Sequence, residues 1–415
     1  MKDPVSFFAR KAMHSWRHSL TSGGRLLVIA LLFAGVLAST AQLMTINHIF
    51  SLLLSFFTIA AITGWIMKPR VRIEGTLPAK ASAGQTVHGQ FSIENTSRLP
   101  VYELGLQFDS LPQYVEHSDH EKVLPCLRPA ELAEFDVELI AWKRGMYDLA
   151  GVRASSSFPF SICQSHGKRH GPGHLLVLPN FFPITSVDVP VGRRYQPGGI
   201  ALTSNVGESP EYIGSRDYRP GDPYRRLDFR SWARLAKPAV KEFQEEYYCR
   251  LALVVDTFVA PGRKKERAGF PELEAAVSMA AAVADALSRG EYVIDVFAAG
   301  PELYVFRAGR HIAHLDNILE ILACVDECRR NPFETITPAI AGELANITSV
   351  ICVLLDWDKD RAAFVRTAIE AGSAAKVVIV RDGPTTEPFA AAEDWAGPIT
   401  LLSPADVASG QVEEI

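Results

Sequence analysis

Two long apolar stretches near the N-terminus constrain the fold of this chain more than any other feature of its sequence. Residues 26–43 and 46–67 contain no Asp, Glu, Lys or Arg. Each is close to the roughly 20 apolar residues that a helix needs to cross a bilayer. A long basic leader, residues 1–25, precedes them, and the second stretch follows the first almost at once, which a cleaved signal peptide does not show. The sequence therefore predicts a transmembrane helical hairpin over residues 26–67.

Lys and Arg residues flank this predicted hairpin but are absent from the connector between its helices. Because basic flanks stay on the cytoplasmic side, both termini and the soluble domains of this multi-pass protein are predicted to be cytoplasmic. The leader is also able to form a basic amphipathic helix lying on anionic lipid, and this alternative remains open beside a plain flanking role. The basic residues concerned are Lys2, Arg10, Lys11, Arg17, Arg25, Lys68, Arg70 and Arg72.

The remainder of the 415-residue chain is too long for one compact domain and leaves room for about two soluble domains. A net charge of −5 does not provide the basic field of a nucleic-acid-binding protein. The six cysteines lack the spacing of a disulfide framework, which agrees with a reducing cytoplasm. Cys324 and Cys328 are one helical turn apart, but no second close Cys/His pair completes a metal site, so we interpret them as buried apolar residues.

Residues 70–163 consist of short segments in which apolar and polar residues alternate, separated by Gly, Pro and Asn. This pattern predicts an all-β, sandwich-like domain in which each sheet buries one face. Residues 164–210 are rich in Gly, His and Pro and are interpreted as a connector that contains one strand. The connector contains three histidines, His166, His170 and His174. A metal site is one interpretation of them, and a solvated loop is the preferred one.

Between residues 251 and 405, strand-like apolar segments alternate with segments of helical periodicity. Such alternation predicts right-handed crossovers and a doubly wound, mostly parallel α/β sheet. Asp256 and Asp356 each follow a predicted central strand. Because ligands of open α/β sheets bind beyond the carboxyl ends of the strands, the two carboxylates are expected to lie close together at that edge. Residues 406–415 are interpreted as an acidic tail.

The segment 211–250, here called the signature segment, joins the connector to the α/β domain. Its core, residues 214–243, combines eight Lys or Arg and four Asp or Glu with five aromatic residues. Pro220, Gly221 and Pro223 predict a tight turn within it. Alternating Arg and Asp on such a turn indicate a rigid network of bidentate ion pairs with stacked rings.

We expect the charged side chains of the signature segment to form one coupled network that holds it against the first strand of the α/β domain. Asp222 and Asp228 are the strongest structural candidates, because Arg residues able to form a fork lie beside each of them. Part of the Arg surface would remain for a partner. The candidate residues for the network or for partner binding are Arg216, Asp217, Tyr218, Arg219, Gly221, Asp222, Arg225, Arg226, Asp228, Arg230, Arg234 and Lys241.

The run RDYRPGDPYRRLDFRSWARLAKPAVKEF, followed by the strand LALVVDTF, resembles the signature of the DUF58 family. The family form is close to R-x-Y-x-x-G-D-x-x-R-x-I-D-W-x-x-[ST]-A-R, then V-[KR]-E and an apolar strand ending in Asp. The resemblance implies a C-terminal domain similar to the von Willebrand factor A fold. With the predicted hairpin, it implies a protein of the bacterial inner (cytoplasmic) membrane. Relatives are often encoded beside MoxR-type AAA+ ATPases and other A-domain proteins, so partners of these kinds are implied.

The metal-dependent adhesion site of A domains uses D-x-S-x-S, a distant Thr and a second Asp. Asp256 matches the first position, but Phe258 and Ala260 stand where the two Ser ligands would be. Thr337 is the candidate for the Thr and Asp356 for the second Asp. Loss of two oxygen ligands weakens the shell that a hard cation requires. We therefore expect no cofactor, with Mg²⁺ or another divalent cation as the weaker alternative. The other interpretation is that these carboxylates accept backbone N–H bonds from the following turn.

Two classes of function compete. The first is a membrane-anchored, non-catalytic scaffold or assembly factor that binds proteins through its A-like domain and signature segment. The second is an enzyme whose Arg-rich signature segment handles phosphate or nucleic acid. No Walker loop, Ser/His/Asp set or complete metal shell accompanies those Arg residues, and the interleaved Asp residues would neutralise them. We predict the scaffold, with lipid bilayer and proteins as partners and no nucleic acid. A purely structural salt-bridge network is a third interpretation.

Overall fold

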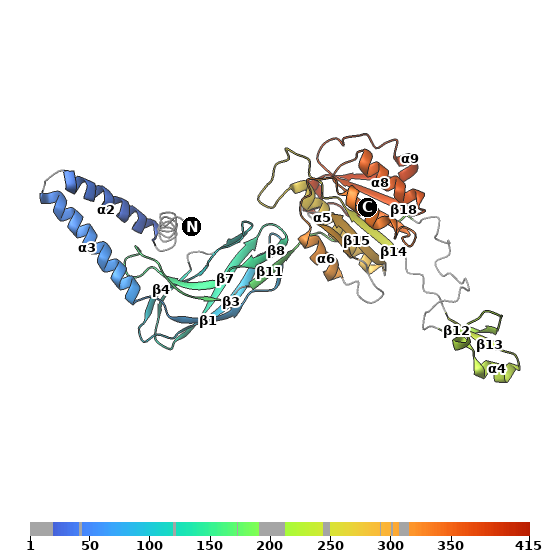
Figure 1. Ribbon diagram of the computed structural model, residues 1–415, viewed down its shortest axis with the longest axis horizontal. Coiled ribbons are helices and arrows are strands. Elements are labelled where there is room, and N and C mark those ends of the chain that lie inside the picture. Colours follow the sequence, from blue (N-terminus) through green and yellow to red (C-terminus); the bar gives the residue numbers. More distant parts are fainter. Residues whose placement is uncertain are drawn as a thin grey trace, which may run out of the picture. The chain divides into compact units, whose positions relative to one another are not determined.

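The computed structural model describes residues 20–40, 44–118, 122–171, 173–190, 212–243, 250–290, 292–299, 302–306 and 315–415. The chain divides into two compact units, Met1–Asn180 and Phe181–Ile415. Figure 1 shows two apolar helices and a β-rich region in the first unit, and an α/β region in the second. The predicted order of these three regions is confirmed. The leader up to residue 19, with its predicted amphipathic helix, lies outside the described residues.

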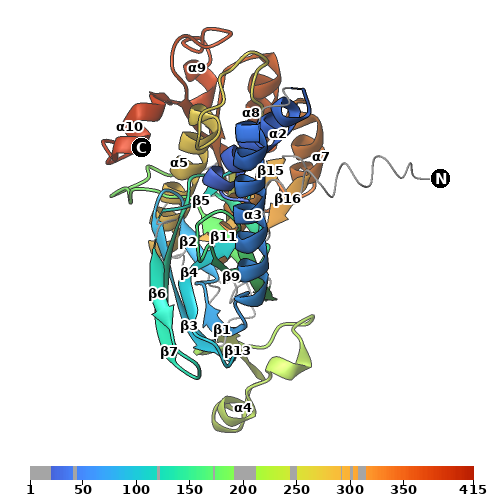
Figure 2. The same cartoon turned by 90° about the vertical axis from the view of Figure 1, so that its left-hand side faces the viewer.

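The predicted apolar hairpin forms two helices, α2 (Ser22–Thr40) and α3 (Met44–Ile66), both long and apolar enough to cross a membrane. They lie side by side in Figures 1 and 2. A helix in lipid must satisfy its polar groups internally. Thr58 and Thr40 accordingly donate their hydroxyls to the carbonyls of Leu54 and Val36, one turn earlier.

The β-rich region contains two four-stranded sheets with a common core. Their orders are β1-β3-β7-β5 and β10-β9-β4-β6, and β2-β11-β8 form a further sheet. Strands β3 and β7 alternate buried and exposed residues, as the period of the sequence predicts. Phe91, Ile93 and Phe135 from the first sheet share one apolar cluster with Leu104 and Leu106 from the second. The strands are β1 (Val71–Thr76), β2 (Lys80–Ser82), β3 (Thr86–Asn95), β4 (Val101–Phe108), β5 (Val115–His117), β6 (Val123–Leu127), β7 (Leu132–Ala141), β8 (Gly145–Leu149), β9 (Val152–Ser156), β10 (Ser165–His170) and β11 (Gly173–Leu178).

The predicted connector, residues 164–210, needs correction at its start. Strand β10, which includes His166 and His170, pairs antiparallel with β9, and β11 pairs with β2 and β8. The one strand predicted in this region is present as β11. Polar residues hid β10, because strand pairing is decided by partners distant in sequence rather than by local composition. The solvated-loop interpretation is therefore wrong for β10. His174 lies in β11, beside Asp148. Residues 191–210 of the predicted connector lie outside the described residues.

The α/β region is built on a six-stranded sheet of order β16-β15-β14-β17-β18-β19. Neighbouring strands are parallel except β15 and β16, as strand–helix alternation predicts. The strands are β14 (Arg250–Val255), β15 (Val293–Ala299), β16 (Leu303–Phe306), β17 (Ser349–Leu354), β18 (Ala374–Val380) and β19 (Ile399–Leu402). The helices are α5 (Pro271–Arg289), α6 (Leu315–Cys324), α7 (Phe333–Ala341), α8 (Lys359–Glu370), α9 (Glu393–Ala396) and α10 (Pro404–Ser409).

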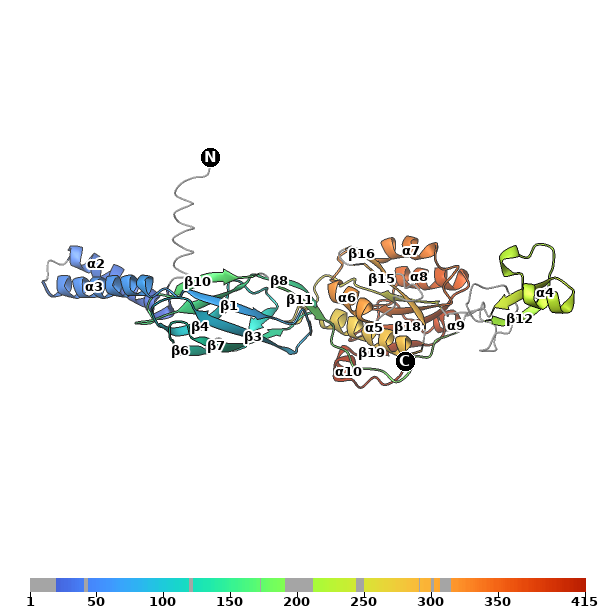
Figure 3. The same cartoon turned by 90° about the horizontal axis from the view of Figure 1, so that it is seen from below.

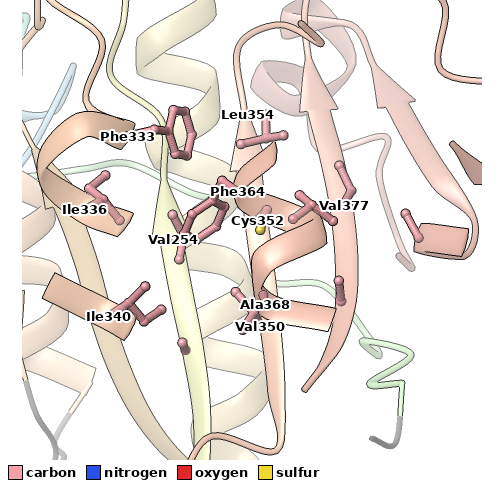
Figure 4. Close-up of a cluster of buried hydrophobic side chains, with 14 of the residues drawn as sticks. Val254, Phe333, Ile336, Ile340, Val350, Cys352, Leu354, Phe364, Ala368 and Val377 are labelled. Carbon is pink, nitrogen blue, oxygen red and sulfur yellow. The ribbon is translucent and has the colours of Figure 1, made fainter. Parts of the chain in front are cut away.

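Helices cover both faces of this sheet. On one face, Ile336 and Ile340 from α7 and Phe364 from α8 pack against Val254 of β14 and Cys352 of β17, as Figure 4 shows. Helix α5, beside α6 in Figure 3, buries an alanine-rich surface that contacts the sheet. The central strands are therefore buried from both sides, which explains their continuous apolar sequences.

The predicted acidic tail, residues 406–415, is an ordered part of this unit. Helix α10 begins at Pro404, where Ser403 caps it through a bond from the Ala405 N–H. Beyond the helix, the Thr185 N–H donates to the Glu413 carbonyl and the Asp188 N–H to the Ile415 carbonyl. The Ile415 side chain is buried. Residues 181–190 and the chain end thus stabilise one another, a long-range pairing without a signal in local composition.

Candidate functional site

The described part of the signature segment is a β-hairpin with a long, partly helical connection. Strand β12 (Tyr212–Asp217) pairs antiparallel with β13 (Ala239–Phe243), and Arg216 lies opposite Val240. The connection holds a 3-10 turn, η1 (Tyr224–Arg226), and the short helix α4 (Phe229–Leu235). Ala239 and Val240 are buried, whereas most of the connection is exposed. The hairpin is the frame that positions the charged side chains.

The predicted tight turn is present at residues 219–222. The Asp222 N–H donates to the Arg219 carbonyl across 3.0 Å. Gly221 has a φ of +108°, a conformation that a side chain at the third turn position would oppose. Pro220 fixes φ at the second position, so the Pro-Gly pair defines a type II turn. This turn brings the Asp222 carboxylate back toward strand β12.

Asp222 is the centre of a bidentate ion pair. The two terminal nitrogens of Arg216 donate to its carboxylate at 2.7 and 2.8 Å, and the Arg219 N–H donates at 2.8 Å. These bonds, from Arg216 first and then from Arg219, lower the pKa of Asp222 from 3.8 to about 2. The Nε of Arg216 pairs with Glu242 of β13 at 3.0 Å. The predicted Arg fork at Asp222 is therefore confirmed, and it links the turn to both strands.

Asp228 has a different role from the one predicted. Its carboxylate accepts the Ser215 hydroxyl at 2.5 Å and the Ser231 hydroxyl at 2.7 Å. It also caps α4 by accepting the N–H groups of Arg230 and Ser231. The Ser hydroxyls and then these N–H groups lower the pKa of Asp228 well below its usual range. The expected Arg fork at Asp228 is wrong: a buried helix cap joins α4 to β12. The predicted single network is thus two centres.

The rings of the segment pair as expected. Tyr218 and Tyr224 lie with ring centroids 6.5 Å apart, and Phe229 and Trp232 of α4 lie 6.2 Å apart. Tyr224 is 77% exposed and Phe229 68% exposed. Apolar side chains this exposed are typical of interaction sites when they cluster with charged residues. Arg226 is half-buried. The remaining candidates are exposed: Asp217, Arg219, Arg225, Arg230, Arg234 and Lys241.

The two strand-end carboxylates of the α/β region form a second candidate site. Strands β14 and β17 are parallel neighbours, and the Asp256 N–H donates to the Val353 carbonyl at 2.9 Å. The Asp256 carboxylate accepts the N–H groups of Phe258 and Leu355, both at 3.0 Å. This matches the interpretation in which a strand-end Asp accepts backbone bonds. It also places Asp256 next to the end of β17, as expected.

An arginine that the sequence did not single out occupies this edge of the sheet. The Nε and a terminal nitrogen of Arg361 reach the same Asp256 oxygen at 2.8 and 2.6 Å. Side-chain exposure is 4% for Arg361 and 0% for Asp256, so this is a buried ion pair. Asp358 caps α8 through a bond from the Arg361 N–H and also pairs with its guanidinium. The cap therefore aims Arg361, in the first turn of α8, at Asp256.

Aromatic rings enclose the Arg361 guanidinium. Its central carbon lies 5.8 Å from the ring centroids of both Phe258 and Phe333. In the resemblance described above, Phe258 stands at the position of a Ser ligand of the adhesion site. The Phe258 ring thus contacts the cation that lies beside Asp256. A sequence signal existed in retrospect, namely the D-x-x-R pattern at residues 358–361 after a central strand.

Asp356 is engaged separately. Its carboxylate accepts the N–H and the hydroxyl of Thr386 at 2.8 and 2.6 Å, accepts the Trp357 N–H, and pairs with Arg381. Burial opposes its ionisation, but these bonds prevail and lower the pKa of Asp356. Thr337 lies inside α7 and is half-buried. Within the described residues, no group of three or more His, Cys, Asp or Glu side chains is placed to hold a metal ion.

Comparison with known proteins adds one family match. The model of the family described as "Protein of unknown function DUF58" matches residues 214–342, which begin in the signature segment and end just after α7. No curated protein matches the chain.

Several solved structures resemble parts of the chain. They include the CARDB domain of a Pyrococcus furiosus protein, with 12% identity over 26% of this chain and 95% of that chain and a TM-score of 0.18. Escherichia coli alpha-2-macroglobulin matches with 16% identity over 31% of this chain and 8% of that chain, at a TM-score of 0.20. A Listeria innocua beta-glucosidase matches with 15% identity over 25% of this chain and 16% of that chain, at 0.15. TM-scores this low carry no argument about function.

Proposed function

We propose that this protein is a membrane-anchored, non-catalytic scaffold that binds partner proteins through its signature segment. The observation that supports this proposal most is that some residues of the segment stabilise its fold while others are exposed to solvent. Asp222 and Asp228 are engaged in holding the hairpin, the turn and α4 together. Tyr224, Phe229 and the Arg side chains of the connection remain exposed. A rigid element that presents rings and Arg to solvent has the composition of a protein-binding hot spot.

The α/β region serves the same role as a von Willebrand factor A-like domain without a working metal site. At its strand-end edge Arg361 neutralises Asp256, where a divalent cation would compete with a covalently tethered cation. No cofactor is needed for the proposed role. The two helices anchor the protein in the inner membrane, with both termini in the cytoplasm, so that the signature segment meets cytoplasmic partners. A MoxR-type AAA+ ATPase or another A-domain protein is the kind of partner proposed.

The test is capture of partners by the full-length protein from native membranes, followed by binding of the purified candidate. We expect Phe229→Ala combined with Arg230→Ala to reduce partner binding by about tenfold or more, as loss of an exposed hot spot does. Lys237→Ala, an exposed change in the same segment, is the matched control. Equal partner binding by the wild type, the double variant and the control would show that the signature segment is not part of the interface.

The competing proposal is that the exposed Arg residues handle phosphate or nucleic acid. The same purified variants distinguish it. Hydrolysis of phosphate esters, or binding of single-stranded nucleic acid that falls steeply with salt and is lost in Arg230→Ala, would favour that function over a scaffold.

A further inference from the structure

A cavity of about 770 Å³ lies in the first unit, where α3 meets the β-rich region. Three segments build it: the last turns of α3, the end of β4, and β9 with β10. The junction is fixed by direct contacts. The Phe56 and Phe160 ring centroids are 5.0 Å apart, and Thr21 donates its hydroxyl to the Ile162 carbonyl at 3.2 Å. Figure 1 shows α3 leading into this end of the β-rich region.

The helix side of the cavity is apolar. Phe57, Ala61, Gly64 and Trp65 line it. Their spacing, i, i+4, i+7 and i+8, places them on one stripe of α3. Lys68 also lines the cavity, and at i+11 it continues the stripe just past the end of the helix. The stripe therefore runs from apolar residues within the helix to a cationic residue at its end.

The sheet side of the cavity is cationic. Arg153 of β9 and Arg169 of β10 both pair with Asp109, which follows β4. One Arg153 nitrogen donates to the Asp109 carboxylate at 2.6 Å. Since two guanidinium groups share one carboxylate, one positive charge remains in excess, and Lys68 adds another. The whole chain carries a net charge of −5, so this cationic site is a local feature rather than part of a general basic surface.

We propose that this cavity binds the headgroup of an acidic phospholipid, with an acyl chain along the α3 stripe. The inference rests on the proposed insertion of α2 and α3 into the membrane. At a membrane-proximal helix end, an apolar stripe that leads into a cluster of Lys and Arg matches the boundary between acyl chains and anionic headgroups. The arrangement favours a lipid over free phosphate, because free phosphate would leave the apolar half of the cavity unfilled. The bound lipid would hold the β-rich region against the hairpin.

The test uses the full-length protein in mild detergent. Native mass spectrometry and thermal melting would compare phosphatidylglycerol with phosphatidylcholine of the same acyl chains, and with inorganic phosphate. We expect phosphatidylglycerol to be retained preferentially and to raise the melting temperature. Each charge removed, in Lys68→Gln and in Arg169→Gln, should weaken its binding about fivefold. Arg169 is 54% exposed, so its replacement is compatible with folding.

The matched control is Lys168→Gln, an exposed change on the same strand that does not line the cavity. Three results would overturn the proposal: equal retention of the two lipids, equal binding of inorganic phosphate alone, or equal weakening by Lys168→Gln and Arg169→Gln. If Arg169→Gln unfolds the protein, Lys68→Gln decides alone. Partner capture through the signature segment is a separate measurement, so a failed lipid site leaves that function standing, and the reverse also holds.

Discussion

At the scale of single residues, Arg361 is the side chain that most changes the interpretation of the chain. The sequence predicts that Asp256 and Asp356 lie close together at one edge of the sheet, with a divalent cation there as the weaker alternative. In the structure each already has an Arg partner, Arg361 or Arg381. A buried carboxylate requires compensation, and a tethered guanidinium provides it without a metal. The strand-end edge is therefore organised as a set of ion pairs.

Breaking the buried pair should destabilise the α/β region strongly. Asp256→Ala leaves the Arg361 charge without its main partner, which costs about 3–5 kcal/mol in the free energy of unfolding. Equilibrium unfolding of the full-length protein in detergent measures it. Glu370→Ala, an exposed change on the same helix as Arg361, is the control and should change the free energy by less than about 0.5 kcal/mol. A cost as small as the control's would show that the pair is not structural.

Divalent metal should bind this edge weakly or not at all. Phe258 and Ala260 provide no oxygen ligands, and Arg361 contacts the Asp256 carboxylate directly. Titration of Mg²⁺ or Ca²⁺ into the wild-type protein should give no saturable heat, and chelators should leave the melting temperature unchanged. Tight calorimetric binding that disappears in Asp256→Ala would contradict this prediction.

At the scale of elements, the signature segment is stabilised at two separate points. Asp222 closes the turn onto β12 and β13, and Asp228 joins α4 to β12. Each carboxylate accepts hydrogen bonds that favour its charged form. The two centres thus stabilise the frame of the segment, and most of its other charged residues remain exposed. The predicted docking of this frame against β14 remains a prediction.

The Asp222 centre should make the segment acid-sensitive. Its pKa is lowered from 3.8 to about 2 in the folded state. A carboxylate whose pKa is lower in the folded state than in the unfolded state stabilises the fold at pH values above its unfolded-state pKa. This stabilisation is lost as the pH falls through its folded-state pKa. The stability difference between wild type and Asp222→Asn should thus be constant near neutral pH and shrink between about pH 4 and about pH 2. Melting curves of both proteins across this pH range test the prediction. A stability difference that grows on acidification would contradict it.

The Asp228 cap should determine whether α4 forms. In Asp228→Ala the first N–H groups of the helix lose their acceptor and Ser215 loses its bond across to α4. We expect faster amide hydrogen exchange throughout α4 and a lower melting temperature. Asp228→Asn keeps an acceptor and should recover most of the protection. Unchanged exchange in Asp228→Ala would mean that ring contacts, such as that between Phe229 and Trp232, hold α4 without the cap.

At the scale of the whole molecule, two apolar helices precede the β-rich and α/β regions. The two units each have their own apolar core, so each is able to fold around its own sheet. In the proposed function, the two helices fix the side of the membrane on which these regions lie. The basic residues at both flanks of the hairpin predict its orientation, because the short connector has none.

Both termini should therefore be cytoplasmic. A C-terminal alkaline phosphatase fusion is expected to be inactive, and a fluorescent protein fused at the same position should be bright. Replacing Lys68, Arg70 and Arg72 together by Gln should weaken this orientation, whereas the same change at the exposed residues Arg98, Lys122 and Arg128 in the β-rich region should not. Phosphatase activity in the unmodified fusion would overturn the topology.

The sequence alone was sufficient to predict what depends on local periodicity. The apolar helices, the alternating strands of the β-rich region, the parallel α/β order and the Pro-Gly turn all follow from patterns within a few residues. Asp222 was also predictable, because its partners lie within the same short segment. Asp256 and Asp356 were placed at one edge by the rule that parallel strands end together.

Only the tertiary structure decided which distant residues meet. Arg361 reaches Asp256 from 105 positions away, and the Thr185 N–H finds the chain end at Glu413. Strand β10 forms despite its His, Gly and Lys residues, because β9 supplies its hydrogen-bond partners. The buried ion pair of Arg361 with Asp256 and the cavity between α3 and β10 depend on such pairings. Local sequence preferences do not predict these long-range pairings, because the stabilising free energy comes from groups that only the complete fold brings together.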